Sequence, residues 1–176
     1  GLFHGYGLTN QKEWNKTLNY SIKAQLLPGK KCNVTLSTQM IKPEDVRINM
    51  YDAGIYYQNN RFHIEAEYLY KMYGHNAFKD VHAVNSFVNY DLPLKKVFNK
   101  ISFLARNDMM TDHSNGTIDE TTKTLIINDY ARHRVTGGIT LSLSKAFIAD
   151  LRLNFEKYFY KKSGIPKESE RDKIVI

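Results

Sequence analysis

Apolar and polar residues alternate with a period of two along most of this chain, the pattern of a β-strand with one apolar and one polar face. Residues 61–72 show it most clearly, because Ile64 and Ala66 alternate with His63 and Glu65. No long run places apolar residues at the i, i+3, i+4, i+7 spacing of a helix. The sequence therefore predicts an all-β chain. The nine predicted strands span residues 17–27, 33–40, 50–58, 61–72, 83–90, 101–108, 131–143, 149–156 and 172–176.

The connections between these predicted strands alternate in length. Short connections fall at 28–30, 59–60, 92–99 and 144–146, and longer ones at 41–49, 73–80, 109–129 and 161–171. Outer-membrane barrels have short turns at their periplasmic end and long loops at the other. The sorting therefore favours an antiparallel up-and-down transmembrane β-barrel over a soluble β-sandwich.

Aromatic residues gather on the apolar face near both ends of the predicted strands. Tyr57, Phe62, Tyr90 and Phe147 lie near the short connections, and Tyr20, Tyr51, Tyr68, Tyr70 and Phe159 lie toward the long ones. Two girdles around an aliphatic band are typical of strands that cross a membrane, because aromatic rings favour the lipid–water interface. We expect these nine side chains to face lipid.

The polar face carries charged side chains in the middle of the strands. The cations predicted to line a lumen are Lys23, Lys71, Arg106, Arg132, Arg134 and Arg152. Cations lower the energy of a permeating anion, so these six are candidates for an anion path. The alternative is that they only balance acidic neighbours in the wall. The acidic residues on the same face are Glu65, Glu67, Asp108, Asp150 and Glu156.

Composition narrows the class of protein further. The 176 residues are 42% hydrophobic and carry a net charge of +7, which suits one folded domain with an anionic partner. Apolar runs such as 146–149 are far shorter than the roughly 18 to 20 residues of a spanning helix, so a transmembrane helix is excluded while a transmembrane barrel is not. The single cysteine, Cys32, excludes an internal disulfide framework and a cysteine-rich metal site.

Catalytic and metal-binding chemistry finds little support in the sequence. His63, Glu65 and Glu67 share a strand face, but alternate residues of a strand lie about 7 Å apart and point in parallel, so they do not converge on one ion. We therefore expect no metal, no cofactor, no catalytic residue and no enzyme activity. Aromatic and basic residues lie on opposite faces, which argues against binding of nucleic acid.

Several short segments resemble the phosphate-selective porin O and P family. The resemblance rests on Arg132–Gly138 at the start of one strand, Leu151–Glu156 in the next and Asp172–Ile176 at the end, preceded by Tyr90–Pro93 and Phe103–Asp108. It implies a sixteen-stranded, trimeric outer-membrane porin that passes anions such as phosphate.

This sequence differs from members of that family in two features that bear on whether it forms a complete barrel. Family members end in a strand with a terminal aromatic residue, whereas this sequence ends at Ile176. Nine strands are an odd number, and bacterial single-chain barrels have an even one. We expect residues 1–176 to form a single, incomplete β-barrel segment, about the second half of a sixteen-stranded barrel.

The expected function is passive diffusion of small hydrophilic solutes, with a preference for anions or phosphate. The expected setting is a homotrimeric porin surrounded by lipid in a bacterial outer membrane. Two alternatives stay open. One is a soluble all-β binding protein, and the other is a plugged outer-membrane barrel with a structural role.

Overall fold

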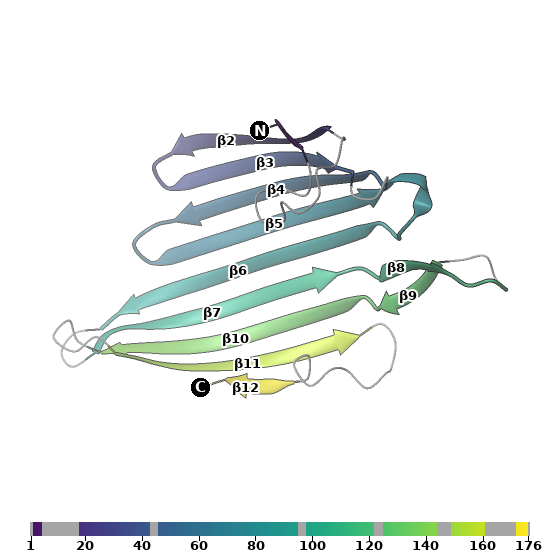
Figure 1. The fold of residues 1–176 in the computed structure, drawn as a ribbon. Helices are drawn as coiled ribbons and strands as arrows, with labels where there is room; N and C mark the ends of the chain where they lie inside the picture. The colour runs from purple at the N-terminus through teal and green to yellow at the C-terminus, as the bar shows by residue number, and fades with distance from the viewer. Residues whose placement is uncertain are drawn as a thin grey trace.

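Antiparallel β-strands make up nearly all of the described chain (Figure 1). The computed structural model describes residues 2–4, 18–42, 46–94, 98–121, 125–143, 149–160 and 172–175. The strands of the main sheet are β1 (Leu2–His4), β2 (Leu18–Gly29), β3 (Cys32–Ile41), β4 (Ile48–Gln58), β5 (Phe62–Tyr73), β6 (Val81–Pro93), β7 (Phe98–Met110), β10 (Arg132–Leu143), β11 (Asp150–Tyr160) and β12 (Lys173–Val175). A short 3-10 helix, η2 (Gly74–Asn76), lies between β5 and β6.

The main sheet has ten strands in the order β1-β2-β3-β4-β5-β6-β7-β10-β11-β12, each antiparallel to its neighbours. All nine predicted strands are confirmed, and β1 is an additional one. Across the described strands the sheet is open, with β1 and β12 at its edges. The structure thus gives an all-β, antiparallel up-and-down sheet. In the described part of the chain, no helix has the length and apolarity to cross a bilayer.

The prediction of a long polar loop over 109–129 was wrong. After β7 ends at Met110, β8 (His113–Ile118) and β9 (Leu125–Asp129) pair as a separate two-stranded sheet. This hairpin extends beyond the main sheet from the ends of β7 and β10 (Figure 1). The run Leu125-Ile126-Ile127 is rich in β-branched residues and was the available signal for a strand.

The first predicted turn is also displaced. The sequence places it at 28–30, but β2 continues through Gly29 and the turn falls at Lys30 and Lys31. Pro28 lies in a register irregularity between Leu26 and Gly29. A bulge tolerates proline there, because the ladder does not require the N–H that proline lacks.

The register of the strands keeps like residues on one face. Leu36 of β3 lies opposite Ala53 of β4, which lies opposite Tyr68 of β5. One residue along, Thr35 lies opposite Gly54 on the other face. Because side chains alternate with a period of two, correct register on every pair yields one apolar and one polar face across the whole sheet.

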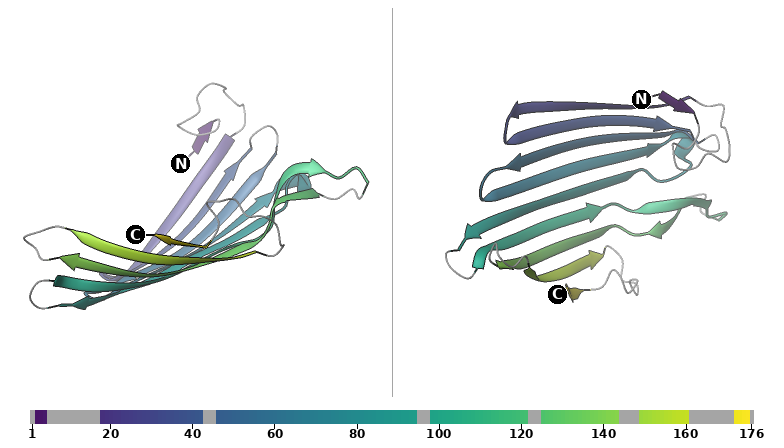
Figure 2. Two further views of the ribbon diagram at one scale, coloured as in Figure 1. Left: turned by 90° about the horizontal axis from the view of Figure 1, so that it is seen from below. Right: turned by 60° about the vertical axis from the view of Figure 1, so that its left-hand side comes forward.

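The apolar face is the more exposed of the two. In β10, Val135 and Ile139 on the apolar face are 40% and 45% exposed, whereas Thr136 and Ser142 on the polar face are 4% and 9% exposed. The sheet is curved (Figure 2), and side chains crowd on the inner side of a curved sheet and spread on its outer side. The contrast in exposure therefore indicates that the polar face is the concave one and the apolar face the convex one.

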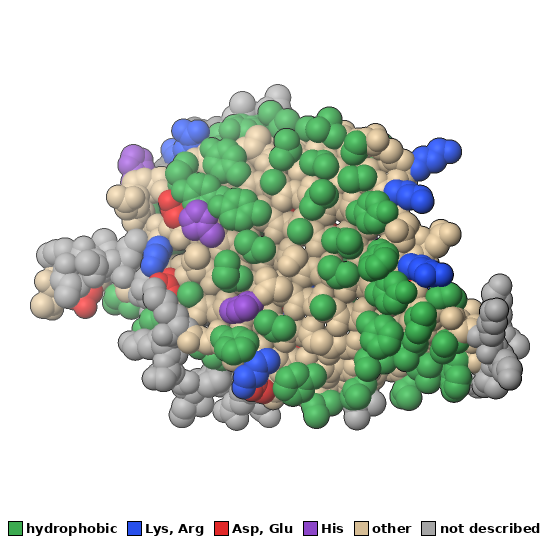
Figure 3. All heavy atoms as spheres, turned by 180° about the vertical axis from the view of Figure 1, so that it is seen from behind, with side chains coloured by type: hydrophobic (Ala, Val, Ile, Leu, Met, Phe, Trp, Pro, Cys, Tyr) green, Lys and Arg blue, Asp and Glu red, His purple; other side chains and the backbone are tan. Residues whose placement is uncertain are grey.

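No part of the described chain covers the convex face. Figure 3 shows hydrophobic side chains spread over it, with charged side chains toward its margins. Large exposed hydrophobic residues occur on strands from β2 to β11, and among the described residues only Ile48, Tyr73 and Val81 are buried hydrophobic ones. This arrangement is the reverse of a globular domain, where the apolar face forms the core.

The ends of the sheet differ in part as the sequence predicts, since the β10–β11 connection, 144–149, is as long as the β3–β4 connection, 42–47. The β2–β3, β4–β5, β6–β7 and β10–β11 connections lie at one end, and the other connections, with η2 and the β8–β9 hairpin, lie at the opposite end (Figure 1). We call these the short-connection end and the long-connection end.

Candidate functional site on the polar face

The six cations predicted to line a lumen all lie on the concave polar face. Lys23 lies at the β2 side of the sheet opposite Ser37, and Arg152 lies at the β11 side opposite Thr140. The structure brings two of the six together at one acceptor, since Arg106 and Arg134 both contact Asp108. The others stand at separate register positions along the face.

Asp108 of β7 is the centre of this charge network. Its carboxylate accepts hydrogen bonds from Arg106 Nε at 2.9 Å, from Arg134 Nη2 at 2.6 Å and from Asn85 Nδ2 at 2.7 Å. The side chain of Asp108 is 21% exposed. Arg106 and Arg134 are therefore each paired with an acidic residue of the polar face, as the alternative to an anion path expects.

The network continues across β11 to β12. Arg134 Nη1 lies 3.9 Å from Glu156 Oε2, and the same oxygen accepts a hydrogen bond from the Tyr158 hydroxyl at 3.0 Å. Lys173 Nζ lies 3.4 Å from Glu156 Oε2. One polar network thus runs over five strands, from β6 to β12, and holds its side chains in fixed positions on the concave face.

A hollow of about 300 Å³ opens on the polar face over β3, β4 and β5. It exists because Gly54 has no side chain, and a Cβ there would lie 2.8 Å from Thr35 Oγ1. Glu65, Glu67 and Lys23 contribute to its lining, and Asn33 Oδ1 is buried there with no hydrogen-bond partner among the described residues. The β4–β5 region of the face is thus richer in carboxylates than the β7–β10 region.

Metal chemistry gains no geometric support here. His63 Nε2 lies 3.7 Å from Glu65 Oε2. No group of three or more His, Cys, Asp or Glu side chains is placed to hold a metal ion within the described ranges. The polar face carries charged side chains of both signs.

The predicted aromatic girdles occupy both ends of the convex face. At the short-connection end, Phe62 and Tyr90 lie 4.8 Å apart between ring centroids. At the long-connection end, Tyr51 stacks on Tyr70 at 6.2 Å. Tyr20, Tyr57 and Phe159 lie within two residues of a strand end, whereas Tyr68 lies nearer the middle of β5. Phe147 lies outside the described residues.

Lys157 of β11 lies on the apolar face opposite Val135 and pairs with Asp172 just before β12. Hydrogen bonds from the Lys157 ammonium and the Tyr158 N–H hold the pKa of the Asp172 carboxyl below its ordinary value. Because the pKa of Asp172 is lower in the folded state than in the unfolded chain, the contact stabilises β12 at pH values above the unfolded pKa. This stabilisation is lost as the pH falls through the folded pKa.

The expected result of a pH titration by NMR is a midpoint for Asp172 below about 3.9, the ordinary carboxyl value. Lys157→Met removes the main cause and is expected to return the midpoint toward that value. An unchanged midpoint in Lys157→Met would contradict the pairing.

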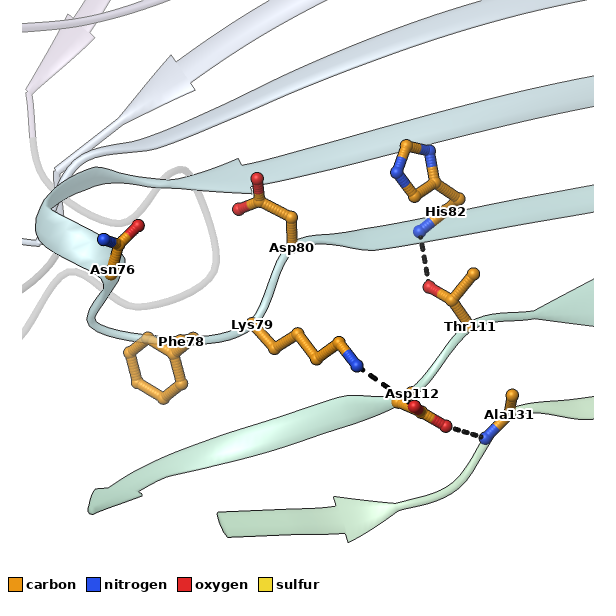
Figure 4. A pocket seen from close by; sticks show the side chains of 8 residues that line it. All are labelled: Asn76, Phe78, Lys79, Asp80, His82, Thr111, Asp112 and Ala131. Atoms are coloured by element: carbon orange, nitrogen blue, oxygen red, sulfur yellow. Dashed lines mark hydrogen bonds and ion pairs between the residues drawn. The ribbon is translucent and has the colours of Figure 1, made fainter. Parts of the chain in front are cut away.

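A second hollow, of about 580 Å³, lies at the long-connection end and has no signal in the sequence. Its lining comes from the β5–β6 connection, the start of β6 and the junctions of the β8–β9 hairpin (Figure 4). These segments are far apart in the sequence, from residue 76 to residue 131. Only the pairing of β6 with β7 and of β7 with β10 brings them together.

Comparisons with known proteins assign no family to this chain. No family model matches it, and neither a curated protein nor a solved structure matches it. The resemblance to the phosphate-selective porin O and P family therefore stays a prediction from the short segments named above.

Proposed function

We propose that this chain is part of an outer-membrane porin through which small hydrophilic solutes diffuse passively. The observation that carries the proposal is the exposed apolar face of the sheet. Val135, Ile139, Leu151 and Phe155 are between 40% and 64% exposed, and nothing in the described chain covers them. Apolar area left in water costs about 25 cal/mol per Å², so a face of this extent requires an apolar environment.

Lipid is the environment that fits both faces at once. Aliphatic side chains with aromatic residues at both ends match a bilayer and its two interfaces. The concave side, with its network around Asp108, matches a water-filled lumen. An open sheet edge does not persist in lipid, because its N–H and C=O groups lack partners there. The proposal therefore includes further strands that close the barrel beyond β1 and β12.

Orientation and assembly follow as parts of the same proposal. The short-connection end is periplasmic and the long-connection end, with the β8–β9 hairpin, is external. A sixteen-stranded barrel, a homotrimer and a location in a bacterial outer membrane are carried over from the family resemblance.

A preference for anions, including phosphate, is the finer part of the proposal. It is supported by the positive net charge of +7 and by six lysine and arginine residues on one face. Against it stand the carboxylates, since Asp108 accepts hydrogen bonds from two of the arginines. The lumenal charge is nearly balanced, so solute preference needs its own measurement.

The test is single-channel conductance of the complete protein refolded into a planar bilayer, with reversal potentials under chloride and phosphate gradients. Discrete open levels with an anionic reversal potential are the expected result. Discrete levels without anion preference would keep the porin and remove the phosphate assignment. A stable inserted barrel without conductance would indicate a plugged, structural barrel. A protein that stays in the aqueous phase would indicate a soluble binding protein.

A further inference from the structure

The hollow at the long-connection end is lined from both faces of the sheet. Asp80 and His82 contact Tyr70 on the apolar face. Phe78 packs against Tyr73, which shares the polar face with Lys71. His82 pairs with Tyr70 across β5 and β6, and the N–H of Thr111 donates to the carbonyl of His82. His82 also stacks on Tyr70, with ring centroids 4.4 Å apart. The hollow therefore adjoins the aromatic residues of this end and opens beyond them. The lining residues are Asn76, Phe78, Lys79, Asp80, His82, Thr111, Asp112 and Ala131.

The walls of this hollow, here called the rim pocket, are held by hydrogen bonds to two buried residues, Asp112 and Ser114. Asp112, 5% exposed, accepts from Lys79 Nζ at 3.0 Å and from the Ala131 N–H at 2.8 Å (Figure 4). The Lys79 N–H donates to Ser114 Oγ at 2.8 Å, and Ser114 is fully buried. These contacts fasten the β5–β6 connection to the β8–β9 hairpin, so the rim pocket is formed before any ligand arrives.

Asp80 is positioned in a similar way. Its Oδ1 accepts from the Tyr73 N–H at 2.9 Å, and its Oδ2 accepts from the Tyr70 hydroxyl at 3.1 Å. Each carboxylate oxygen has a second acceptor site, so the side chain retains capacity for a ligand. The carboxylate is thus held in place in the lining of the pocket.

The remaining hydrogen-bonding groups are mixed donors and acceptors. Within the described part of the chain, the Asn76 amide makes no side-chain hydrogen bond. His82 uses Nδ1 toward the Tyr68 hydroxyl, which leaves Nε2. The Thr111 hydroxyl accepts from the His82 N–H and keeps its own proton to donate. Phe78 adds a ring to the lining, which packs against Tyr73 at 4.9 Å.

This chemistry separates the classes of ligand. A phosphate requires excess positive charge, whereas Lys79 is opposed by Asp80 and Asp112. A metal ion requires three or more converging ligands, and no such group occurs among the described residues. A lipid tail would leave the polar lining without partners. Hydroxyl groups both donate and accept, so a polyhydroxylated ligand satisfies an amide, a carboxylate, an imidazole and a hydroxyl together.

We propose that the rim pocket binds a saccharide. A volume of about 580 Å³ lies within the 300 to 1,000 Å³ range of ligand sites and accommodates a small oligosaccharide. Asn76, Asp80 and His82 offer hydrogen bonds to its hydroxyl groups, and Phe78 contributes an apolar part of the lining. Binding of a saccharide does not rest on the proposed porin. Only the source of the saccharide rests on the proposed porin, because in an outer membrane this rim faces the saccharide headgroups of the outer leaflet.

The test uses the complete protein in detergent micelles with two kinds of probe. Saturation-transfer NMR measures binding of maltose and of the N-acetylglucosamine disaccharide. Native mass spectrometry in mixed micelles measures adducts with a glycolipid that carries a core oligosaccharide, against phosphatidylcholine. Binding of the disaccharides indicates a soluble saccharide, and binding of the glycolipid alone indicates a lipid-borne one.

Two variants report on the rim pocket. Phe78→Ala removes the ring, and Asn76→Gly removes the amide at a residue with a φ of 52°, which glycine adopts without strain. Each variant is expected to weaken binding of whichever saccharide probe binds to the unchanged protein by about tenfold, which is the effect of losing one polar or ring contact. Phe98→Ala, at the short-connection end, is the matched control and is expected to bind as the unchanged protein does.

The proposal is overturned if no saccharide probe binds to the unchanged protein. It is also overturned if Asn76→Gly and Phe78→Ala both bind as tightly as Phe98→Ala, or if inorganic phosphate displaces the bound saccharide. A loss of conductance in the porin test leaves this result unaffected, so the two proposals fail separately.

Discussion

Val88→Arg is expected to lower the free energy of unfolding of the complete protein in a lipid bilayer by about 2 to 4 kcal/mol. Val88 lies near the middle of β6, on the apolar face, opposite Ile64 and Ala105. It is 40% exposed in the described chain. In a barrel this side chain faces the hydrocarbon core, where a guanidinium group is expensive. Urea unfolding in phosphatidylcholine vesicles measures the effect.

Asn89→Arg is the matched control for this prediction. Asn89 is the next residue of β6 and points to the opposite, polar face, where its amide donates to Asp91. We expect a loss of about 1 kcal/mol, from that single hydrogen bond. A soluble sheet reverses the order, because an exposed valine replaced by arginine changes stability by only about 0.5 kcal/mol. Equal small effects at Val88 and Asn89 would therefore argue against the membrane assignment.

Asp108→Asn is expected to shift the reversal potential toward anions and to reduce stability. The substitution removes the charge that Arg106 and Arg134 share, and leaves two guanidinium groups on the concave face. One unit charge about 10 Å from the ion path changes the energy of the ion by about 0.4 kcal/mol in water, which is about a twofold change in permeability ratio. Loss of the charged hydrogen bonds is expected to reduce the free energy of unfolding by about 1 to 3 kcal/mol.

Glu120→Gln is the control for the selectivity measurement, because it makes the same change in charge outside the main sheet. Glu120 lies in an exposed turn between β8 and β9. We expect its reversal potential to match that of the unchanged protein. If Asp108→Asn leaves the reversal potential unchanged, the concave face is not the wall of an ion path.

The strands and their two faces follow from the sequence because alternation is a local property. A strand places residues i and i+2 on one side whatever its neighbours are, so segments such as 61–72 identify their own apolar face. The order of strands follows from short connections, which force antiparallel neighbours. Both features were therefore predictable for nine strands of the main sheet, and the same reasoning places the six cations on one face.

The alternation of apolar and polar residues predicts neither the hairpin of β8 and β9 nor the side-chain contacts of the site. The β8 segment is polar and gives no such signal, and its pairing with β9 depends on where β7 and β10 end and on the anchoring of Asp112. The shared position of Arg106 and Arg134 at Asp108 depends on the register between β7 and β10. That register is a long-range quantity, because it joins residues 26 positions apart.

The sequence by itself determined that this protein is an all-β chain with one apolar and one polar face, since both come from side-chain periodicity. The tertiary structure decided which face is exposed, because exposure depends on the direction in which the sheet curves. It also decided that Gly54 opens a hollow beside Thr35 and that residues from 76–82, 111–112 and 131 line the rim pocket. These features arise where separate strands meet, and no single segment of the chain encodes them.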